Sequence, residues 1–457
     1  MARHMTRVAI IGGGIGGLML AVALHRLSAP VEVDVYESTA QFTELGAGIG
    51  MSNRVWEIME WLDLADDLRP LARSFGEPIH HRKADQAEGI DLSTMLHRGV
   101  ISFHRVDLQS ALCKNLPSSV RVHFSKRLSS YIQSDTDGIE IHFQDDSIAN
   151  CDVLVGCDGI RSTVRSIMLN ALAADMEKAG QHVEAAAALS GVKPQWTGTV
   201  FYRSLIPRDA FVREFPNHRA LSENMIYIGK GKHFIGYTIG TGDDLKVSVG
   251  GVVGNPDLEG SDYNGPWVAP GSKDEVMRHF AHFEPEVRAL ASYMDEPLRW
   301  ALHVIPPLPT HVHDKVALLG DAAHAMVPYQ GAGAGQAIED AYILASVLAH
   351  PGITMKTLPV ALQVYNEIRR PFVQEVQRKS RESGLLLQFN TADFSKFTAE
   401  ESALGAIDAS AVDTVGRRQE ELTAWFDDTS LQADVERAKE LLNERLGAHG
   451  KVSWNEL

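Results

Sequence analysis

The segment from residue 7 to residue 37 reads RVAIIGGGIGGLMLAVALHRLSAPVEVDVYE. Residues 7–11 form an apolar run typical of a strand, and a cluster of glycines follows at once. Residues 18–27 contain helix-forming side chains without a breaker, and residues 31–37 alternate valine with polar residues, as a half-buried strand does. This order of strand, tight turn, helix and strand predicts an α/β fold that opens with a Rossmann-like unit.

Three glycines of the turn, Gly12, Gly14 and Gly17, fit the pattern G-x-G-x-x-G. The first permits the turn, the second lets the backbone approach a pyrophosphate, and the third lets the helix pack on the strand. The helix N-terminus then presents free N–H groups to the phosphates. Glu37 ends the second strand, where a carboxylate can accept hydrogen bonds from both ribose hydroxyls. We favour a dinucleotide site over a plain glycine-rich turn; FAD and NAD stay open, and the acid disfavours NADP.

The composition is that of an ordinary globular protein, with 44% hydrophobic and 22% charged residues. A length of 457 residues predicts two or three domains. The formal net charge of −16 repels nucleic acid and anionic membranes, so neither is an expected partner. Three cysteines are too few for a disulfide framework, and no Cys/His spacing resembles a zinc site, so we expect no metal.

The long apolar stretch of the chain runs from Val8 to Leu24 and is interrupted by the glycines. It is too short for a comfortable membrane span, and no basic region with a cleavage site precedes it. We therefore expect a cytoplasmic protein.

A second glycine-rich loop follows another apolar strand, residues 315–319, which ends in Gly320 and Asp321. Ligands bind at this end of the strands in open α/β sheets. A helix is predicted at 336–350, and its N-terminus would favour negative charge, as on a reduced flavin ring. A second phosphate loop is the alternative, but the Lys-Ser/Thr pair of a P-loop is missing. The glycine-rich loop between strand and helix contains Pro328, Gly331 and Gly333.

Two further positions lie at junctions between predicted elements. Asp158 follows an apolar strand and precedes Gly159-Ile160-Arg161-Ser162, so it fits either a helix cap or a nucleotide contact. Arg105 lies between a predicted strand and a helix, where a single arginine is usually a surface charge.

Strand-like runs dominate residues 195–305, and we expect them to form a sheet inserted into the dinucleotide domain. His233 and Tyr237 lie four apart in one of these runs, which places both on one face of a strand. Taken alone, each would more often be a packed or edge side chain. Near the C-terminus, Leu431, Val435, Ala438 and Leu442 recur at helical spacing, which predicts packing on the dinucleotide domain, with a dimer contact as the alternative.

Three motifs together resemble those of the class A FAD-dependent aromatic hydroxylases, and the salicylate hydroxylases among them most. They are GGGIGG with Glu37, CDGIRSTVR at 157–165 and GDAAHAMVPYQGAGAGQAIEDA at 320–341. The resemblance implies a p-hydroxybenzoate hydroxylase-like fold: a Rossmann-like FAD-binding domain with an inserted substrate sheet and a helical C-terminal region. The implied boundaries are 1–190 and 306–390 for the FAD-binding domain, 191–305 for the substrate domain and 391–457 for the helical region.

The resemblance also implies roles for the cofactor residues. Glu37 would bind the adenosine ribose, Arg105 the pyrophosphate region of FAD, and Asp321 its ribityl and phosphate part. Asp158 and Arg161 would belong to a motif tied to FAD and to NAD(P)H. Pro328, Gly331 and Gly333 would line the isoalloxazine ring. The family has no second nucleotide domain, so NADH or NADPH would reach the flavin from outside.

On the substrate side, the resemblance favours His233 and Tyr237 as contacts, and Tyr202 and Arg203 more weakly, with Arg203 as a carboxylate partner. Many relatives have histidine where this chain has Tyr329. A tyrosine has a much higher reference pKa, so the identity of the base stays open among Tyr329, His233 and Tyr237.

The implied reaction is hydroxylation of a phenolic acid with NAD(P)H and O2 through a flavin hydroperoxide. The expected substrate is salicylate or another hydroxybenzoate, and loss of CO2 from salicylate would give catechol. A flavin dehydrogenase or reductase without oxygen insertion is one alternative, and a flavin-binding regulator is another. A monomer or a homodimer is expected.

Overall fold

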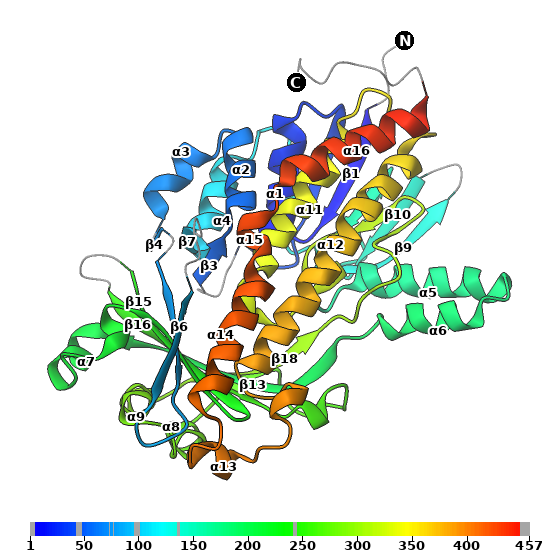
Figure 1. The fold of residues 1–457 in the computed structure, drawn as a ribbon. Helices are drawn as coiled ribbons and strands as arrows, with labels where there is room; N and C mark the ends of the chain where they lie inside the picture. The colour runs from blue at the N-terminus through cyan, green and yellow to red at the C-terminus, as the bar shows by residue number, and fades with distance from the viewer. Residues whose placement is uncertain are drawn as a thin grey trace.

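The structure is a computed structural model that describes residues 5–42, 48–72, 74–75, 77–95, 101–134, 138–240 and 245–447 (Figure 1). Its first domain is built on a six-stranded sheet in the order β19-β20-β12-β1-β2-β8, in which only β19 is antiparallel to its neighbour. The predicted strand, helix and strand at the start are β1 (Thr6–Ile11), α1 (Ile15–Arg26) and β2 (Val31–Tyr36). The other strands of this sheet are β8 (Arg121–His123), β12 (Val153–Gly156), β19 (Val312–His313) and β20 (Val316–Leu318).

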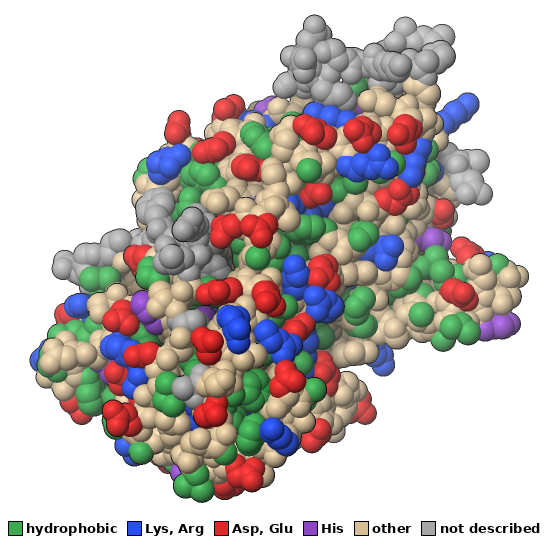
Figure 2. Space-filling view, viewed as in Figure 1, with side chains coloured by type: hydrophobic (Ala, Val, Ile, Leu, Met, Phe, Trp, Pro, Cys, Tyr) green, Lys and Arg blue, Asp and Glu red, His purple; other side chains and the backbone are tan. Residues whose placement is uncertain are grey.

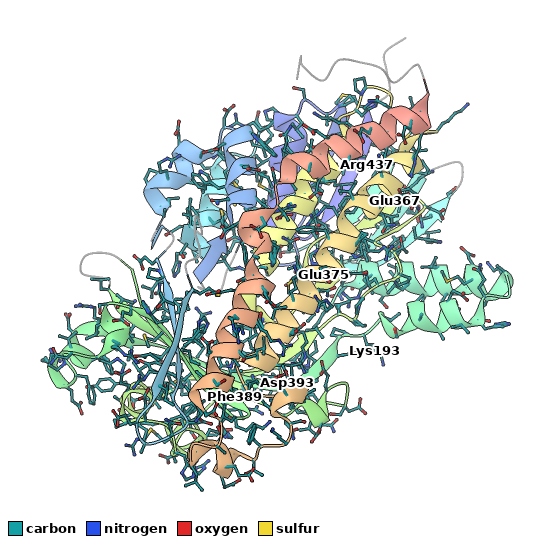
Figure 3. All side chains as sticks on the ribbon, viewed as in Figure 1. Lys193, Glu367, Glu375, Phe389, Asp393 and Arg437 are labelled. Carbon is teal, nitrogen blue, oxygen red and sulfur yellow. The ribbon has the colours of Figure 1, made fainter. Side chains whose placement is uncertain are left out.

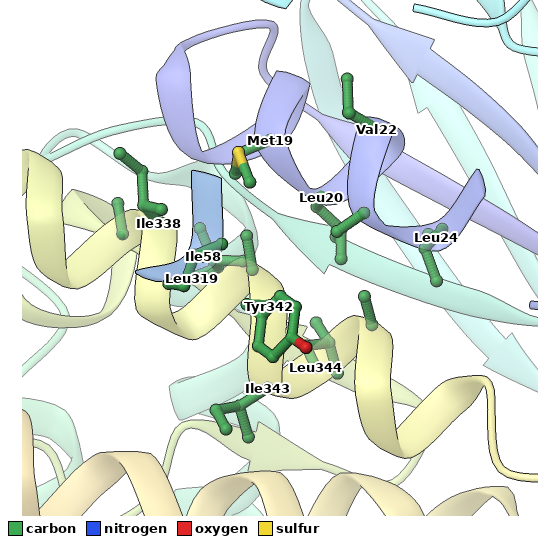
Figure 4. Packing of buried hydrophobic residues seen from close by; sticks show 14 of the residues in the cluster. Met19, Leu20, Val22, Leu24, Ile58, Leu319, Ile338, Tyr342, Ile343 and Leu344 are labelled. Carbon is green, nitrogen blue, oxygen red and sulfur yellow. The ribbon is translucent and has the colours of Figure 1, made fainter. Parts of the chain in front are cut away.

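Both faces of this sheet are buried, because alternate residues of β1 enter different cores. Val8 and Ile10 join a core with α1 and α11 (Gly333–Leu348), whose side chains interdigitate in Figure 4. Ala9 and Ile11 join a second core under α5 (Thr163–Lys178). The same face is covered by a three-stranded antiparallel sheet of β9 (Leu128–Ser134), β10 (Gly138–Phe143) and β11 (Ile148–Cys151). Burial on both faces explains why these parallel strands are apolar throughout.

Smaller elements complete the first domain. A three-stranded antiparallel sheet contains β3 (Gly48–Met51), β4 (Ser74–Phe75) and β7 (Ile101–His104). The other helices and short helical turns of this domain are α2 (Asn53–Trp61), α3 (Ala65–Leu68), η1 (Arg69–Leu71), α4 (Arg105–Lys114), α6 (His182–Ser190), α10 (Asp321–His324) and η5 (Pro328–Gln330).

The second domain is an eight-stranded sheet in the order β17-β18-β13-β16-β15-β14-β5-β6. Six of its strands come from the expected segment: β13 (Gln195–Pro207), β14 (Asn224–Gly229), β15 (Lys232–Ile239), β16 (Lys246–Gly254), β17 (Val268–Pro270) and β18 (Leu298–Val304). The remaining two, β5 (Ile79–Lys83) and β6 (Ile90–Met95), come from within the first 190 residues. The sequence gives little sign of β5, because IHHRK is polar although its His81 and Lys83 are buried.

The two faces of the eight-stranded sheet have different neighbours. One face packs on α7 (Arg208–Glu214), α8 (Lys273–His279) and α9 (Pro285–Ser292) around Tyr227, Phe234 and Phe280. The short helix η2 (Arg219–Leu221) contacts β14 and β15, and η4 (Pro256–Leu258) contacts β13. The other face contributes Ile226 and Ile228 to a core with the C-terminal helices. This second face is also the one that bears the cavity described below.

Long C-terminal helices run across both domains (Figure 1). Leu431, Val435, Ala438 and Leu442 of the last helix are buried in the core of α1 and α11, as their spacing predicts. Residues 448–457 of the expected helical region lie outside the described residues. The helices are α12 (Leu358–Leu386), η6 (Ala392–Phe394), α13 (Ala399–Ala403), α14 (Ala409–Thr423), α15 (Trp425–Asp428) and α16 (Leu431–Leu446).

Acidic and basic side chains are interspersed over these helices on the face shown in Figure 2. Glu367 and Glu375 lie on the outer side of α12 (Figure 3), where they pair with Arg445 and Arg378. None of the described helices is both long and apolar enough to cross a membrane. The α/β fold class predicted from the sequence is confirmed.

Candidate active site

The glycine turn after β1 is fixed by close backbone packing. Gly12 has φ +110°, and a Cβ on it would overlap the carbonyl oxygen of Cys157. A Cβ on Gly17 would overlap the carbonyl oxygen of Gly12. Gly14 is different, because nothing lies within 4 Å of a Cβ placed on it and no side chain caps α1 there. The space and the helix N-terminus that a pyrophosphate needs are therefore both present at Gly14.

Glu37 holds the same turn from the end of β2. Its Oε2 accepts a hydrogen bond from the N–H of Gly13 at 2.8 Å, and its Oε1 accepts from the N–H of Thr39 at 2.8 Å. Burial alone would raise the pKa of Glu37, but these hydrogen bonds and those from the Thr39 and Ser38 hydroxyls lower it overall. An ionised carboxylate beside the turn is what an acceptor for ribose hydroxyls requires.

The two glycine-rich loops meet at the carboxyl edge of the six-stranded sheet. A Cβ on Gly16 would lie 2.6 Å from Cδ2 of Leu319 and 3.3 Å from Cβ of Ala337, so the first turn of α1 contacts the second loop and α11. Gly331 has φ +64°, and nothing lies within 4 Å of a Cβ on it or on Gly333, where α11 begins without a side-chain cap. A second open helix N-terminus thus lies close to the first.

Asp158 acts as a helix cap. Its Oδ2 accepts hydrogen bonds from the N–H groups of Thr163 and Val164 at 2.8 and 3.2 Å, and its Oδ1 accepts from Ser162 Oγ at 2.5 Å. Both oxygens are therefore engaged at the start of α5, as in a helix cap, and the role of Asp158 toward a nucleotide stays a prediction. The neighbouring Arg161 lies over the Trp267 ring, 4.1 Å from its centroid, and so links this loop to the second domain.

Asp321 and Arg105 lie where the sequence places them, at the first residues of α10 and α4. Asp321 is exposed and Arg105 is partly buried. Pro328 is exposed at the start of η5, in the second loop. The roles of these three residues toward FAD stay predictions.

A buried ionic network beneath the second loop was not anticipated. Arg369 of α12 donates hydrogen bonds to Asp340 at 2.8 Å and to Glu339 at 2.9 Å. Asp340 also accepts from the N–H of Gly320 at 3.1 Å and is hydrogen-bonded to His324 Nε2 at 2.5 Å. Burial alone would raise the pKa of Asp340, but His324 and Arg369 lower it overall. The network therefore fixes the turn that precedes Asp321.

The same network extends to the C-terminal helix. Arg54 of α2 donates to Glu339 at 3.0 Å and to Asp434 of α16 at 2.6 Å. The sequence signal for this network is the pair Glu339-Asp340 inside an otherwise apolar helix, because such acids are buried only with partners. No group of three or more His, Cys, Asp or Glu suited to a metal ion occurs in the described part of the chain.

A cavity of about 580 Å³ lies between the eight-stranded sheet and the second loop. Among the predicted residues, His233 and Tyr237 of β15 line it from the sheet, and Pro328, Tyr329 and Gly331 line it from the loop. The ring centroids of His233 and Tyr329 are 5.5 Å apart, in an edge-to-face arrangement. The structure therefore brings together the three residues considered for catalysis.

His233 is buried in the cavity wall as a neutral imidazole. Burial, with a smaller contribution from the neighbouring His81, lowers its pKa to about 3. Its Nδ1 makes no hydrogen bond within the described chain. Burial also raises the pKa of Tyr329, whose hydroxyl accepts a weak hydrogen bond from Gln388 at 3.4 Å. Both groups are therefore uncharged near neutral pH. His81, which also lines the cavity, was missed because its strand was missed.

The structure does not bring Tyr202 or Arg203 into the cavity lining. Tyr202 points to the opposite face of the sheet, where it is 2% exposed and donates a hydrogen bond to Glu275 at 2.6 Å. Residues alternate between the faces of a strand, so Tyr202 and a cavity residue such as Phe201 cannot share a side. Arg203 is on the cavity face but outside the lining, and no Lys or Arg occurs among the described residues that line the cavity.

Comparison with known proteins agrees with this arrangement. The family described as FAD binding domain matches residues 5–203 and 309–380, which is more than half of the chain. The chain belongs to this family. The chain is 32% identical to the salicylate hydroxylase of Pseudomonas putida over 95% of its own length and 94% of that protein. It is equally similar to the FAD-dependent monooxygenase str9 of Strobilurus tenacellus, over 96% of this chain and 98% of that protein.

Solved structures support the same family assignment. A salicylate hydroxylase substrate complex aligns with a TM-score of 0.79 and 28% identity, over 95% of this chain and 98% of that one. HpxO of Klebsiella pneumoniae, in complex with FAD and uric acid, aligns with a TM-score of 0.68 at 21% identity, which shows a shared fold. The resemblance to the class A FAD-dependent aromatic hydroxylases is thus confirmed.

The residues present fit FAD. The turn at Gly14 has room for a pyrophosphate at an uncapped helix, and Glu37 offers an ionised acceptor beside it. The open backbone at Gly331 lines the cavity, where a planar ring can approach N–H groups, whereas Gly333 has open space beside it but is not part of the lining. FAD is the cofactor of this monooxygenase, and NAD(P)H is the co-substrate typical of its family.

Proposed function

We propose that this monooxygenase hydroxylates a phenolic aromatic acid, either salicylate or another hydroxybenzoate, with NAD(P)H and O2. The observation that carries the proposal is the cavity of about 580 Å³, which His233 and Tyr237 line from the sheet and Tyr329 lines from the loop. A volume of this size suits one small aromatic ring beside a flavin. The names of the relatives from Pseudomonas putida point to the same substrate class.

FAD, when bound, supplies the electrons taken from NAD(P)H and the activation of O2. The protein orients the ring, polarises its hydroxyl and excludes water. His233 is a hydrogen-bonding partner and a poor base, because an imidazole with a pKa of about 3 does not hold a proton near neutral pH. Tyr329 is protonated there too, so its hydroxyl accepts a hydrogen bond from Gln388 and is free to donate its own proton in a hydrogen bond to the phenol oxygen.

The charge of the side chains that line the cavity decides how the carboxylate of an aromatic acid could be bound. Without Lys or Arg among the described lining residues, a carboxylate would be held by neutral donors, such as the hydroxyls of Tyr237 and Ser222. Where the attacked carbon bears the carboxylate, CO2 leaves, and salicylate gives catechol. The same lack of a cation favours a second candidate substrate, a phenol that carries an uncharged group in place of the carboxylate.

The test is a substrate panel with the FAD-loaded enzyme. Salicylate, the other hydroxybenzoates and salicylamide are each assayed for stimulated oxidation of NADH and of NADPH, with product analysis under labelled O2. We expect label in a hydroxylated product of at least one hydroxybenzoate. Turnover of salicylamide alone would replace the acid by the uncharged phenol. NAD(P)H oxidation that leaves no label in any product would reject hydroxylation in favour of a reductase.

A further inference from the structure

Helices that follow the family match form one wall of the cavity. The match ends at residue 380, and α14 and α15 lie beyond it. Gln419 and Thr423 of α14 and Phe426 of α15 all line the cavity, opposite the sheet that carries His233. The three positions are spaced by four and three residues, so they lie along one side of the helical segment. We call this surface the C-terminal wall.

Gln419 presents an oriented acceptor in this wall. Its Nε2 donates a hydrogen bond to the carbonyl oxygen of Ser383 at 2.9 Å, which fixes the amide. The other amide atom, Oε1, makes no hydrogen bond within the described chain, and the side chain is 3% exposed. Thr423 lies one turn further on and donates its hydroxyl to the carbonyl oxygen of Gln419 at 2.8 Å. Since Gln419 lines the cavity, a ligand there can donate a hydrogen bond to this oxygen.

Trp425 connects this wall to the second glycine-rich loop, which is the flavin-binding loop under the proposed function. Its indole Nε1 donates to Oε1 of Gln330 at 3.2 Å, and Nε2 of Gln330 donates to the carbonyl oxygen of Leu422 at 3.2 Å and to Ser383 Oγ at 2.9 Å. Gln330 is the residue after Tyr329, in η5. The Trp425 ring is itself fixed by stacking on Phe426, with centroids 4.1 Å apart. The side chain of a loop residue is thus held on three sides by the C-terminal helices.

We propose that the C-terminal wall selects the substrate, with Gln419 accepting a hydrogen bond from a hydroxyl or amino substituent on the ring and Trp425 positioning the flavin-binding loop through Gln330. This inference rests on the proposed function and deepens it. Gln419 is a specificity residue because it lines the cavity, and Trp425 is a positioning residue because it acts through Gln330.

The first experiment makes two separate variants, Gln419→Leu and Thr423→Val. Each keeps the approximate shape of the side chain and removes its polar atoms. Dihydroxybenzoates and aminosalicylates are compared with methylsalicylates of the same substitution pattern. We expect the Gln419→Leu enzyme to lose about five- to tenfold in kcat/KM for the donor-bearing ring relative to its methyl counterpart, since one neutral hydrogen bond is removed. Glu421→Gln, an exposed change on the same helix, is the control and leaves this ratio unchanged.

The second experiment changes Trp425 to Phe, which keeps the ring stacking and removes the donor. We expect a larger share of the consumed NAD(P)H to yield hydrogen peroxide in place of hydroxylated product, at unchanged FAD content. A merely structural role would lower the melting temperature and the FAD content together and leave the peroxide share as it was.

Two results separate the inference from the proposed function. If the unmodified enzyme hydroxylates no aromatic compound, the proposed function fails before any variant is made. If it does, and if Gln419→Leu folds with full FAD yet changes kcat/KM for all rings by the same factor, the C-terminal wall does not select the substrate. Should Gln419→Leu fail to fold, Gln419→Met, which keeps the length of the side chain and lacks the amide, decides on the same ratio.

Discussion

Gly384 of α12 lies directly against the ring of Tyr329. A Cβ on Gly384 would overlap Cδ2 and Cε2 of that ring and lie 2.7 Å from its Cζ. The position of Tyr329 in the cavity wall therefore depends on the absence of a side chain at Gly384, more than fifty residues further along the chain.

Changing Gly384 to Ala should destabilise the enzyme and displace Tyr329. In a helix interior this change ordinarily stabilises by about 0.5–1 kcal/mol, but overpacking here should reverse the sign and cost about 1–3 kcal/mol. The measurements are urea unfolding and the ratio of product to NAD(P)H consumed. Tyr329→Ala in the same chain removes the clash, so the double variant should lose less stability than the sum of the two single losses. Additive losses would show that the ring moves aside freely.

Removing Arg369 should unfold the loop that precedes Asp321. Arg369→Met removes the cation that Asp340 and Glu339 share in the buried network, and breaking such a pair costs about 3–5 kcal/mol. The matched control is Arg378→Met on the same helix, whose exposed pairs with Glu375 and Glu382 are worth less than about 1 kcal/mol. Thermal unfolding and FAD retention are measured for both. Equal losses in the two variants would mean that the buried network adds nothing.

The glycines of the first turn should separate folding from cofactor binding. Gly17→Ala forces a Cβ into the carbonyl oxygen of Gly12, so we expect little folded protein. Gly14→Ala meets no protein atom within 4 Å, so the chain should fold with a near-normal melting temperature in the absence of FAD. Its FAD affinity should nevertheless fall at least tenfold, because the methyl group occupies the pyrophosphate position. If Gly14→Ala bound FAD with full affinity, the phosphates of FAD would not bind at this turn.

The fold could be predicted from the sequence where local pattern and packing agree. β1, the glycine turn and α1 follow from an apolar run, a glycine spacing and a helix without breakers, all within one short segment. The tail helix followed from the spacing of Leu431, Val435, Ala438 and Leu442 in the same way. Strand β5 could not, because the burial of its Lys83 depends in part on a partner distant in sequence, the carbonyl oxygen of Ser402, which accepts a hydrogen bond from Lys83 at 2.9 Å.

The candidate site shows the same division. His233 and Tyr237 share the cavity face because strand alternation is a local rule, and the same rule turns Tyr202 away once the face of its strand is known. Which face that is depends on β16 and on the helices packed behind it, and the sequence does not give their pairing. Gln419 of α14 could be predicted to line the cavity only if the path of the chain after residue 380 were known. No local sequence pattern indicates that path.

His311 is a second buried neutral histidine. Its side chain is fully buried beside His324, with ring centroids 5.8 Å apart, and neither ring nitrogen makes a hydrogen bond within the described chain. Burial, with a smaller contribution from His324, lowers its pKa to about 3, against an ordinary value of 6.5. Asp340 opposes this shift weakly, and Arg369 and Arg370 add to it.

The stability of the enzyme should therefore fall as the pH drops below about 6.5. The unfolded chain then binds a proton at His311 that the folded chain refuses, so this one group should cost about 2 kcal/mol at pH 5. Above that range the ring is neutral in both states and has no effect. His311→Leu should flatten the pH dependence of the urea midpoint between pH 7 and about pH 5, whereas His25→Gln, an exposed change in α1, should leave it alone. If the slope of the urea midpoint against pH were the same in His311→Leu, His311 would bind the proton equally well in the folded and the unfolded chain.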